Sequence, residues 1–306
     1  MATEPTIAVL RSTPILARTR MTSVYATAAD YWALTKPEVN FLVLIATFVG
    51  FHLGSNSAPS LVLVRTLVGT LLVASGAAAL NQFIERSFDA QMRRTSRRPL
   101  ATGKLRPSNA LWFGISLSVL GGLCLEAINT LTAVLALATL LSYLFLYTSL
   151  KRKTPLCTLA GAFPGAVPPL IGWAAARGRL DSEAWVLYFI LFLWQFPHFM
   201  SIAWMYRADY SRAGYQVLPA GRLRDPFVTW QSFAFALALV PVALLPTVTG
   251  ESGIVYAFGA ALLSLAFFYT SARFAFHPDN VRARQLLVAS IIYLPLLFTL
   301  LVLDRK

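Results

Sequence analysis

Charged side chains are scarce in this sequence of 306 residues. They make up 13% of it, and apolar residues make up 57%, whereas an ordinary soluble domain carries about 25% charged residues. A soluble globule with so little polar surface would not stay in solution, which excludes that class. Two cysteines are too few for a disulfide framework. The sequence also lacks the segments of about 10 residues with alternating apolar and polar side chains that are typical of an outer-membrane barrel. The composition indicates a helical membrane protein.

The few charges divide the chain into nine long uncharged runs. Each run has at least 19 residues, close to the ~20 that a helix needs to cross about 30 Å of hydrocarbon. The sequence therefore predicts an all-α polytopic membrane protein with nine transmembrane helices around a central cavity, and a turn near residues 54–60. The nine runs are 39–64, 66–84, 107–125, 127–150, 154–176, 184–206, 226–250, 252–272 and 285–303.

Acidic residues number only 13 against 26 basic ones, which gives a net charge of +13. Such an excess is also found in nucleic-acid-binding domains, but here 21 of the 26 basic residues fall on one side of the predicted membrane. The positive-inside rule then predicts a cytoplasmic N-terminus and an external C-terminus. Membrane lipid is the expected environment, and no nucleic-acid partner is expected.

The predicted organisation is a cytoplasmic segment, 1–38, followed by one membrane domain, 39–306. Residues 1–38 hold no long apolar core, so no cleavable signal peptide is expected. The longest connections are 85–106 and 207–225, both on the predicted cytoplasmic side. Because chemistry is disproportionately found on loops over a rigid scaffold, the site is expected at this face.

Three oxygen-bearing side chains lie at the end of the second span. Asn81, Glu85 and Asp89 are spaced i, i+4 and i+8, so on a continuing helix they share one face. Such oxygen ligands suit Mg²⁺, which takes one or two carboxylates and leaves other positions to water or phosphate. Arg94 and Arg98 follow directly, and guanidinium groups bind diphosphate bidentately. An ordinary capped helix end before a basic loop is the alternative explanation.

Further candidates lie at the same face or within the spans. Tyr147, Lys151 and Arg152 form a second basic turn, for which a membrane anchor is the alternative. Asp209 offers another metal contact or an ion pair with Arg207 or Arg212. His198 lies within an uncharged run, where a polar ring is costly and is a functional candidate by default; a structural role beside Pro197 is the alternative. In the fifth run, three prolines interrupt the regular bonding and two glycines allow close helix approach; this fits a helix that curves around a central cavity, and tight packing is the alternative.

Several motifs together carry a family resemblance. They are Asn81-xxx-Glu85-xxx-Asp89, Met92-Arg-Arg94-Thr-Ser-Arg-Arg98-Pro99, Tyr147-Thr148, Lys151-Arg152, Pro168-Pro169, Trp194-Gln-Phe-Pro197-His198-Phe199 and Arg207 with Asp209-Tyr210. The sequence resembles the protohaem IX farnesyltransferases of the intramembrane polyprenyltransferase superfamily, from Thr35-Lys36-Pro37 to about Pro219. Glu85 stands where the superfamily usually has Asp, Cys157 where Asn is common, and Ala208 where an acid usually precedes Asp209.

The resemblance implies an enzyme of a bacterial inner membrane that uses Mg²⁺ to convert farnesyl diphosphate and haem B to haem O and diphosphate. It implies metal ligands at Asn81, Glu85 and Asp89, and a catalytic Lys151. Haem-modifying or oxidase-assembly proteins are implied partners, with no residue of the sequence to contact them. The implied substrate contacts are Arg94, Arg98, Tyr147, Arg152, His198, Arg207 and Asp209.

Two other functions remain open at this point. A sister prenyltransferase acting on an aromatic acid, a quinone precursor or another tetrapyrrole would use the same first motif. A transporter would tend to place its polar residues near the bilayer midplane, whereas here they gather at one edge.

Overall fold

The computed structural model describes residues 28–55, 59–216 and 226–306 of the chain, and within these ranges the structure is almost entirely helical. Three predicted regions therefore lie partly outside the described residues: most of the N-terminal segment 1–38, the middle of the turn near residues 54–60, and the end of the 207–225 connection with Pro219. The helices, in chain order, are α1 (Ala28–Thr35), α2 (Pro37–Gly54), α3 (Ser60–Asp89), α4 (Pro107–Glu126), α5 (Thr130–Leu141), the π-helical turn η1 (Ser142–Tyr147), α6 (Thr148–Leu150), α7 (Cys157–Gly165), α8 (Pro168–Arg177), α9 (Ser182–Met205), α10 (Arg207–Arg212), α11 (Pro226–Val248), α12 (Ile254–Phe276) and α13 (Asn280–Leu303).

The predicted membrane architecture is confirmed. Nine helical stretches of the described chain are long and apolar enough to cross a bilayer, and no strand is found among the described residues. The fourth stretch joins α5, η1 and α6, and the fifth joins α7 and α8. Six of the remaining seven spans are single helices throughout, and the seventh is α11 from Val228 onward. The protein is a multi-pass α-helical membrane protein.

The second span is longer than its uncharged run. The run 66–84 was bounded by Arg65 and Glu85, but α3 has 30 residues and includes both. Arg65 is exposed in the first turns of the helix, whereas Glu85 is buried. α2 ends at Gly54 and α3 begins at Ser60, on either side of the turn expected near residues 54–60, of which residues 56–58 lie outside the described part of the chain. At a rise of 1.5 Å per residue, α3 is about 45 Å long, more than the hydrocarbon thickness requires.

The fifth span is broken, as its prolines predict. α7 ends at Gly165, and α8 begins at Pro168. Proline is favourable at the first position of a helix, because the N–H that it lacks would have no partner within the helix. A Cβ on Gly161 would meet the ring of Tyr147 at 2.6 Å, and one on Gly165 would meet Gln195 Oε1 at 2.1 Å. Both glycines therefore allow the close approaches that the sequence predicted.

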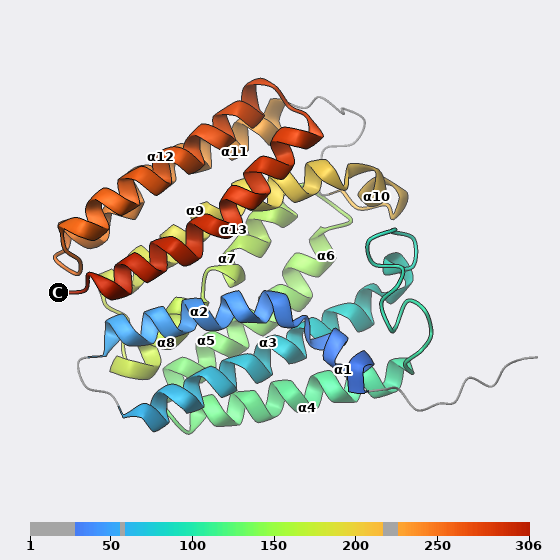
Figure 1. Ribbon diagram of the computed structural model, residues 1–306. Helices are drawn as coiled ribbons and strands as arrows, with labels where there is room; N and C mark the ends of the chain where they lie inside the picture. The colour runs from blue at the N-terminus through green and yellow to red at the C-terminus, as the bar shows by residue number, and fades with distance from the viewer. Residues whose placement is uncertain (1–27, 56–58, 217–225) are drawn as a thin grey trace, which may run out of the picture.

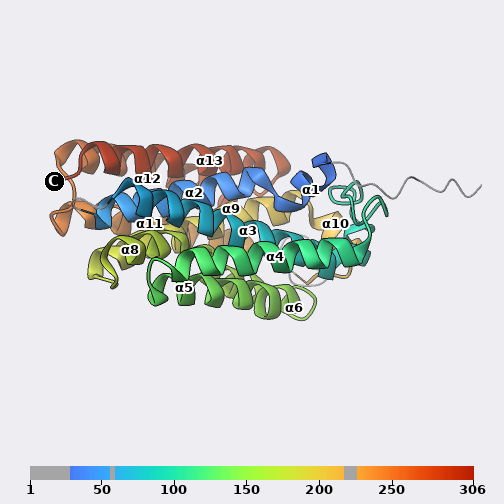
Figure 2. The ribbon, with the colours of Figure 1, turned by 90° about the horizontal axis from the view of Figure 1, so that it is seen from below.

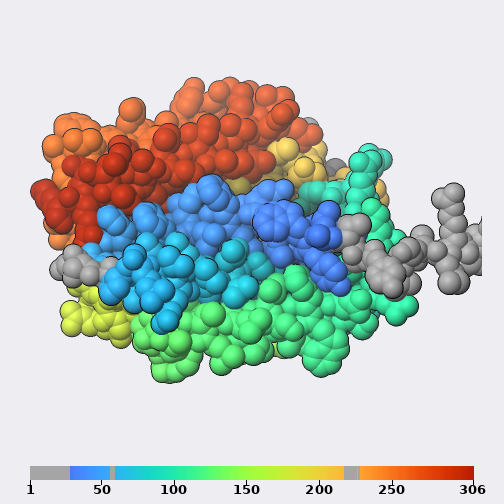
Figure 3. All heavy atoms as spheres, turned by 60° about the horizontal axis from the view of Figure 1, so that its bottom comes forward, coloured from blue at the N-terminus to red at the C-terminus, as the bar shows by residue number. Residues whose placement is uncertain are grey.

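The long helices run side by side along one direction (Figures 1 and 2). α3 packs against α4 through glycines, because a Cβ on Gly76 would lie 2.7 Å from Gly114 O and one on Gly121 would lie 2.7 Å from Gly69 O. Backbones that approach this closely are typical of membrane helix pairs. In the space-filling view α2 and α3 lie between α4 and α13 (Figure 3). This packing fixes the position of α3 within the bundle.

The two ends of the bundle differ. The short helices α1 and α10 and the connection after α3 gather at one end, and the C-terminus lies at the other (Figure 1). α1 belongs to the segment 1–38 predicted to precede the membrane domain, yet it packs on α3. Its Leu34 is fully buried in a cluster with Ala79, Leu100 and Leu105. The end that carries α1 therefore also contains the last turns of α3.

Candidate functional site

The site is built on the last three turns of α3. Asn81, Glu85 and Asp89 lie on one face of this continuous helix, and their exposed fractions are 1%, 5% and 2%. α3 is longer than the hydrocarbon core requires, and these turns come at its end, next to the connection that follows the helix. The predicted grouping of the three side chains is therefore found in the structure, in a buried setting.

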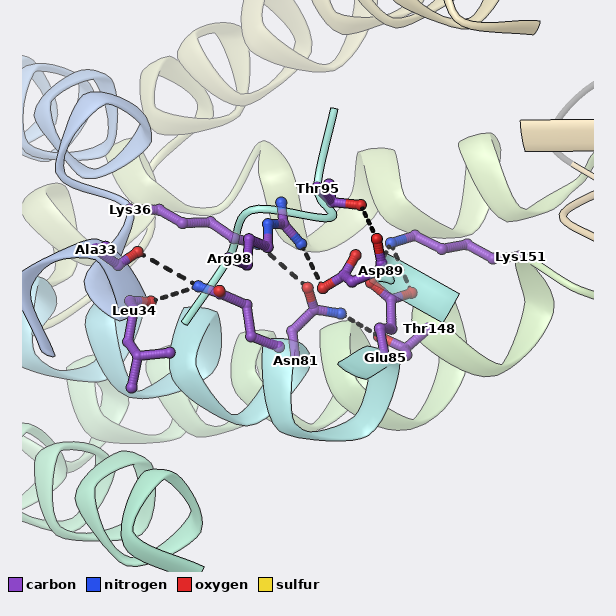
Figure 4. A network of polar contacts seen from close by, with 11 residues as sticks. Ala33, Leu34, Lys36, Asn81, Glu85, Asp89, Thr95, Arg98, Thr148 and Lys151 are labelled. Carbon is purple, nitrogen blue, oxygen red and sulfur yellow. Dashed lines mark hydrogen bonds and ion pairs between the residues drawn. The ribbon is translucent and has the colours of Figure 1, made fainter. Parts of the chain in front are cut away.

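Three cations contact these three side chains, one each (Figure 4). Lys36 Nζ lies 3.1 Å from Asn81 Oδ1, and Lys151 Nζ lies 2.9 Å from Glu85 Oε1. Arg98 Nη1 lies 2.7 Å from Asp89 Oδ2. The cations come from the α1–α2 junction, the end of the fourth span and the 90–105 connection, so four segments meet at this face. Charge-assisted hydrogen bonds of this kind are roughly twice as strong as neutral ones.

The amide of Asn81 is oriented by its neighbours. Its Nδ2 donates to Thr148 Oγ1 at 3.2 Å, and the Thr148 hydroxyl donates to the carbonyl of Tyr143 at 2.9 Å. This arrangement leaves the oxygen of the amide to face Lys36. Tyr143 belongs to η1, and π-helical turns of this kind are frequent at functional sites. The turn was not predicted from the sequence.

Asp89 has one carboxylate oxygen without a partner. Oδ2 binds Arg98, but the buried Oδ1 has no hydrogen bond within the described residues. The backbone oxygen of Asp89 accepts from Thr95 Oγ1 at 2.9 Å, which holds the following turn against the helix end. A buried unpaired carboxylate oxygen is costly, and a hard cation such as Mg²⁺ would satisfy it. The donor set of amide and carboxylate oxygens thus fits the predicted metal.

A metal at this face would need ligands from outside the protein. No group of three or more His, Cys, Asp or Glu side chains in the described ranges is arranged to hold a metal ion. The two carboxylates and Asn81 would therefore be completed by water or by phosphate oxygens, which is usual for Mg²⁺.

The connection after α3 contributes one of its arginines to this face. Arg98 binds Asp89, whereas Arg94 is exposed and its guanidinium lies 5.5 Å from the ring centroid of Tyr206. The backbone N–H of Arg94 donates to Asp209 Oδ2 at 3.4 Å. Asp209 is buried and also pairs with Arg212, one of the two ion pairs considered from the sequence. Asp209 thus supports the connection that carries Arg94.

Lys151 lies among aromatic rings. Its Nζ is 4.5 Å from the ring centroid of Tyr147 and 5.9 Å from that of Tyr215. Such cation–π contacts add to its ion pair with Glu85. Arg152 is exposed and lies over Phe88, at 4.4 Å from the ring centroid. The basic turn therefore sends Lys151 inward to the site and Arg152 outward over the end of α3.

The remaining two candidates lie on other elements. Arg207 Nη1 donates to Trp204 O at 2.6 Å and to Asn280 Oδ1 at 2.8 Å, which ties it to the start of α13. His198 on α9 stacks on Trp194 at 4.9 Å, and its Nδ1 lies 2.8 Å from Ser290 Oγ. Neither residue forms a hydrogen bond or ion pair with the α3 side chains in the described structure.

Sequence reasoning did not assign two residues of the site, the partly buried Lys36 and the buried Tyr215. Lys36 was counted only as a basic residue before a proline, although burial, with the charges of Arg98 and Lys151, lowers its pKa to about 7. Tyr215 is buried close to Glu85. Burial and the charge of Glu85 raise the pKa of Tyr215. For Lys36, the one signal in the sequence was its position directly before Pro37, which begins α2.

Comparisons with known proteins agree with this architecture. The model of the UbiA prenyltransferase family matches residues 43–299. A protein of Solibacter usitatus named protoheme IX farnesyltransferase is 48% identical over 287 residues, which cover 90% of this chain and 98% of that protein. A Salinibacter ruber protein of the same name is 43% identical over 277 residues and has the same coverage.

Solved structures share the fold at low sequence identity. A UbiA homologue from Aeropyrum pernix K1 has a TM-score of 0.71 at 20% identity, over 86% of this chain and 98% of its own. A UbiA homologue from Archaeoglobus fulgidus bound to GPP and Mg²⁺ has a TM-score of 0.64 at 14% identity, over 89% and 99%. With a family model that spans most of its length and relatives matched almost end to end, the chain belongs to the UbiA prenyltransferase family.

Proposed function

We propose that this protein transfers a farnesyl group from farnesyl diphosphate to a vinyl group of haem B, in the presence of Mg²⁺, to give haem O and diphosphate. The observation that carries the proposal is the buried face of Asn81, Glu85 and Asp89, contacted by three cations at one end of the bundle. The name protoheme IX farnesyltransferase, borne by relatives that match this chain almost end to end, supports haem as the acceptor.

Asn81, Glu85 and Asp89 are the residues that would hold the metal. The unpaired, buried Oδ1 of Asp89 supports this assignment. A bound Mg²⁺ supplies charge that stabilises the leaving diphosphate. The Archaeoglobus fulgidus homologue, bound to GPP and Mg²⁺, supports the use of such a metal within the fold.

The cations of the site would bind the diphosphate. Arg98 and Lys151 already lie within hydrogen-bond distance of the α3 carboxylates, and Arg94 and Arg152 come from the same two connections. Donors fixed in advance around the leaving group stabilise its developing charge without reorganising during the reaction. Tyr147, whose ring faces Lys151, would line this pocket where the prenyl chain begins.

The proposed reaction is an electrophilic alkylation of the haem vinyl group by the farnesyl group. The bond between C1 of the farnesyl group and the diphosphate oxygen breaks, and the diphosphate keeps the electron pair. The terminal carbon of the haem vinyl group supplies the electrons for the new bond to C1. Water then adds to the adjacent carbon and loses a proton, which leaves the hydroxyl of the product. The apolar helices around the site would keep other water from the allylic cation.

His198 is the proposed contact for haem. The Ser290 hydroxyl donates to Leu287 O at 2.6 Å, so its oxygen accepts from Nδ1–H of His198 at 2.8 Å. This leaves Nε2 as the ring nitrogen with a free lone pair, the form of histidine that binds a metal ion. Trp194, which donates to Ser290 O at 2.9 Å and stacks on His198, fixes the plane of the ring.

Two more side chains complete the proposal. Asp209, through the Arg94 N–H, would hold the 90–105 connection over the diphosphate. Arg207, at the start of α10 and bound to Asn280 of α13, would contact the acceptor. We further propose that the protein lies in a bacterial inner membrane with this end in the cytoplasm, because 21 of 26 basic residues fall on that side of the predicted topology.

The test is a reconstituted assay. Purified protein in proteoliposomes receives farnesyl diphosphate, haem B and Mg²⁺, and the products are analysed by mass spectrometry. The expected result is a farnesylated, hydroxylated haem and one diphosphate per product. A panel of aromatic acids and quinone precursors runs in parallel. Prenylation of one of these without haem O would move the protein to a sister activity, and no prenylated product from any acceptor would refute the proposal.

A further inference from the structure

Lys36 has a backbone conformation that side chains other than glycine rarely adopt. Its φ is 51° and its ψ is 63°, and it is the one non-glycine residue with positive φ in the described ranges. For an L-residue this left-handed conformation is sterically unfavourable, because Cβ comes too close to the following carbonyl oxygen. Strained residues persist where the surrounding structure holds them, and they cluster at ligand sites.

Two side chains hold the backbone of the two residues just before Lys36. Gln82 Nε2 on α3 donates to Leu34 O at 2.9 Å, and Asn40 Nδ2 on α2 donates to Thr35 O at 2.8 Å. Asn40 Nδ2 also lies 2.9 Å from Ser75 Oγ on α3. The α1–α2 junction is therefore braced against α3 one residue from the proposed metal ligand Asn81. The brace sends the Lys36 side chain inward, onto the same face as Glu85 and Asp89 (Figure 4).

The charge of Lys36 is not matched by a carboxylate. Lys151 pairs with Glu85 and Arg98 pairs with Asp89, but the partner of Lys36 is the neutral oxygen of Asn81. In the described structure no carboxylate lies within ion-pair distance of Lys36. A buried ammonium without a counter-ion is expensive. Three cations against two carboxylates leave one positive charge for a ligand to balance.

We propose that Lys36 is a third cation of the diphosphate site and contacts the diphosphate of the prenyl substrate directly. The inference rests on the proposed function, because it takes the ligand of the α3 face to be a prenyl diphosphate. An anionic phosphate oxygen supplies the counter-ion that Lys36 lacks. The left-handed backbone is then the structural cost of bringing the ammonium to this position.

The test distinguishes the effect of the Lys36 charge from the effect of its left-handed backbone conformation. Lys36→Met removes the charge, and Lys36→Gly removes it while relieving the left-handed conformation. Lys36→Arg keeps the charge. Lys153→Met is the matched control, since Lys153 is exposed at the same end and its side chain has no hydrogen bond or ion pair in the described structure. Each variant is assayed for the KM of farnesyl diphosphate, the KM of haem B and the Kd of inorganic pyrophosphate with Mg²⁺.

Lys36→Met and Lys36→Gly should raise the farnesyl diphosphate KM and the pyrophosphate Kd by about 10–100-fold, the usual weight of a charge-assisted hydrogen bond. The haem KM should stay unchanged, Lys36→Arg should recover part of the loss, and Lys153→Met should match the wild type. Values within twofold of the wild type for Lys36→Gly would overturn the inference. If the wild type makes no prenylated haem, the proposed function fails, yet the pyrophosphate Kd of the variants still tests Lys36.

Discussion

The ammonium of Lys151 lies 2.9 Å from Oε1 and 3.1 Å from Oε2 of Glu85, across 66 residues of sequence. Both side chains are largely buried, with exposed fractions of 14% and 7%. A pair in this setting joins the end of the fourth span to α3, and removal of either partner leaves the other charge buried and alone. The ion pair between Lys151 and Glu85 therefore contributes to the stability of the fold and belongs to the proposed active site.

This pair can be separated into its structural and chemical contributions. Glu85→Gln and Lys151→Met should each destabilise the protein by about 3–5 kcal/mol, whereas the double variant should recover part of this loss because no lone charge is left. Thermal unfolding in detergent measures the cycle. Turnover should fall at least about 100-fold in all three proteins. Strict additivity of the two single effects on stability would argue against a direct pair.

Removal of the metal should stop the reaction without unfolding the protein. EDTA should abolish haem farnesylation, and added Mg²⁺ should restore it, because the α3 oxygens and the diphosphate need the metal charge. Asp89→Ala should lose activity and show no recovery at high Mg²⁺. Circular dichroism should show unchanged helix content in both cases. Full activity of Asp89→Ala would remove Asp89 from the metal site.

Ser290 should affect the binding of haem and not the binding of farnesyl diphosphate. Ser290→Ala removes the acceptor of His198 Nδ1–H, so the ring loses its fixed tautomer, and changes to such supporting groups cost about 10–100-fold in metal affinity. We expect weaker haem binding and a shifted Soret band, with the farnesyl diphosphate KM unchanged. Ser290→Thr keeps the hydroxyl and should bind haem better than Ser290→Ala. An identical haem spectrum and Kd in Ser290→Ala would exclude this role.

The α2–α8 contact should not tolerate a methyl group. A Cβ on Gly172 would lie 1.9 Å from Thr47 O, so Gly172→Ala must push two backbones apart at a cost of about 1–3 kcal/mol. Gly122→Ala is the control, since nothing lies within 4 Å of its Cβ position and alanine favours helix by about 1 kcal/mol. The midpoint of thermal unfolding should therefore fall for Gly172→Ala and stay equal or rise for Gly122→Ala.

Glu251 should make stability depend on pH at the other end of the bundle. Burial, and then the charge of Glu183, raise the pKa of Glu251 above its ordinary 4.5. The protonated form is thus favoured in the folded state, and this stabilisation is lost as the pH rises through the raised pKa. Glu251→Gln should match the wild type below pH 4.5 and be more stable at pH 7. Thermal midpoints across this range measure the difference, with the exposed Glu126→Gln as control; equal midpoints of Glu251→Gln and wild type at pH 7 would contradict the assignment.

Much of the architecture was predictable because it depends on local properties of the chain. Run lengths of apolar residues predicted nine spans, and prolines predicted the break between α7 and α8. The i, i+4, i+8 spacing predicted that Asn81, Glu85 and Asp89 share a face. The uncharged run ends at residue 84, and the helix expected to continue beyond it is present, since α3 includes Glu85 and ends at Asp89.

The sequence by itself determined the spans and the shared face of α3, since helical periodicity relates residues only a turn or two apart. The tertiary structure decided which cation meets which oxygen. Lys36 reaches Asn81 across 45 residues and Asp209 reaches the Arg94 N–H across 115, and these separations carry no periodic signal. Such contacts form only where packed helices bring distant segments together.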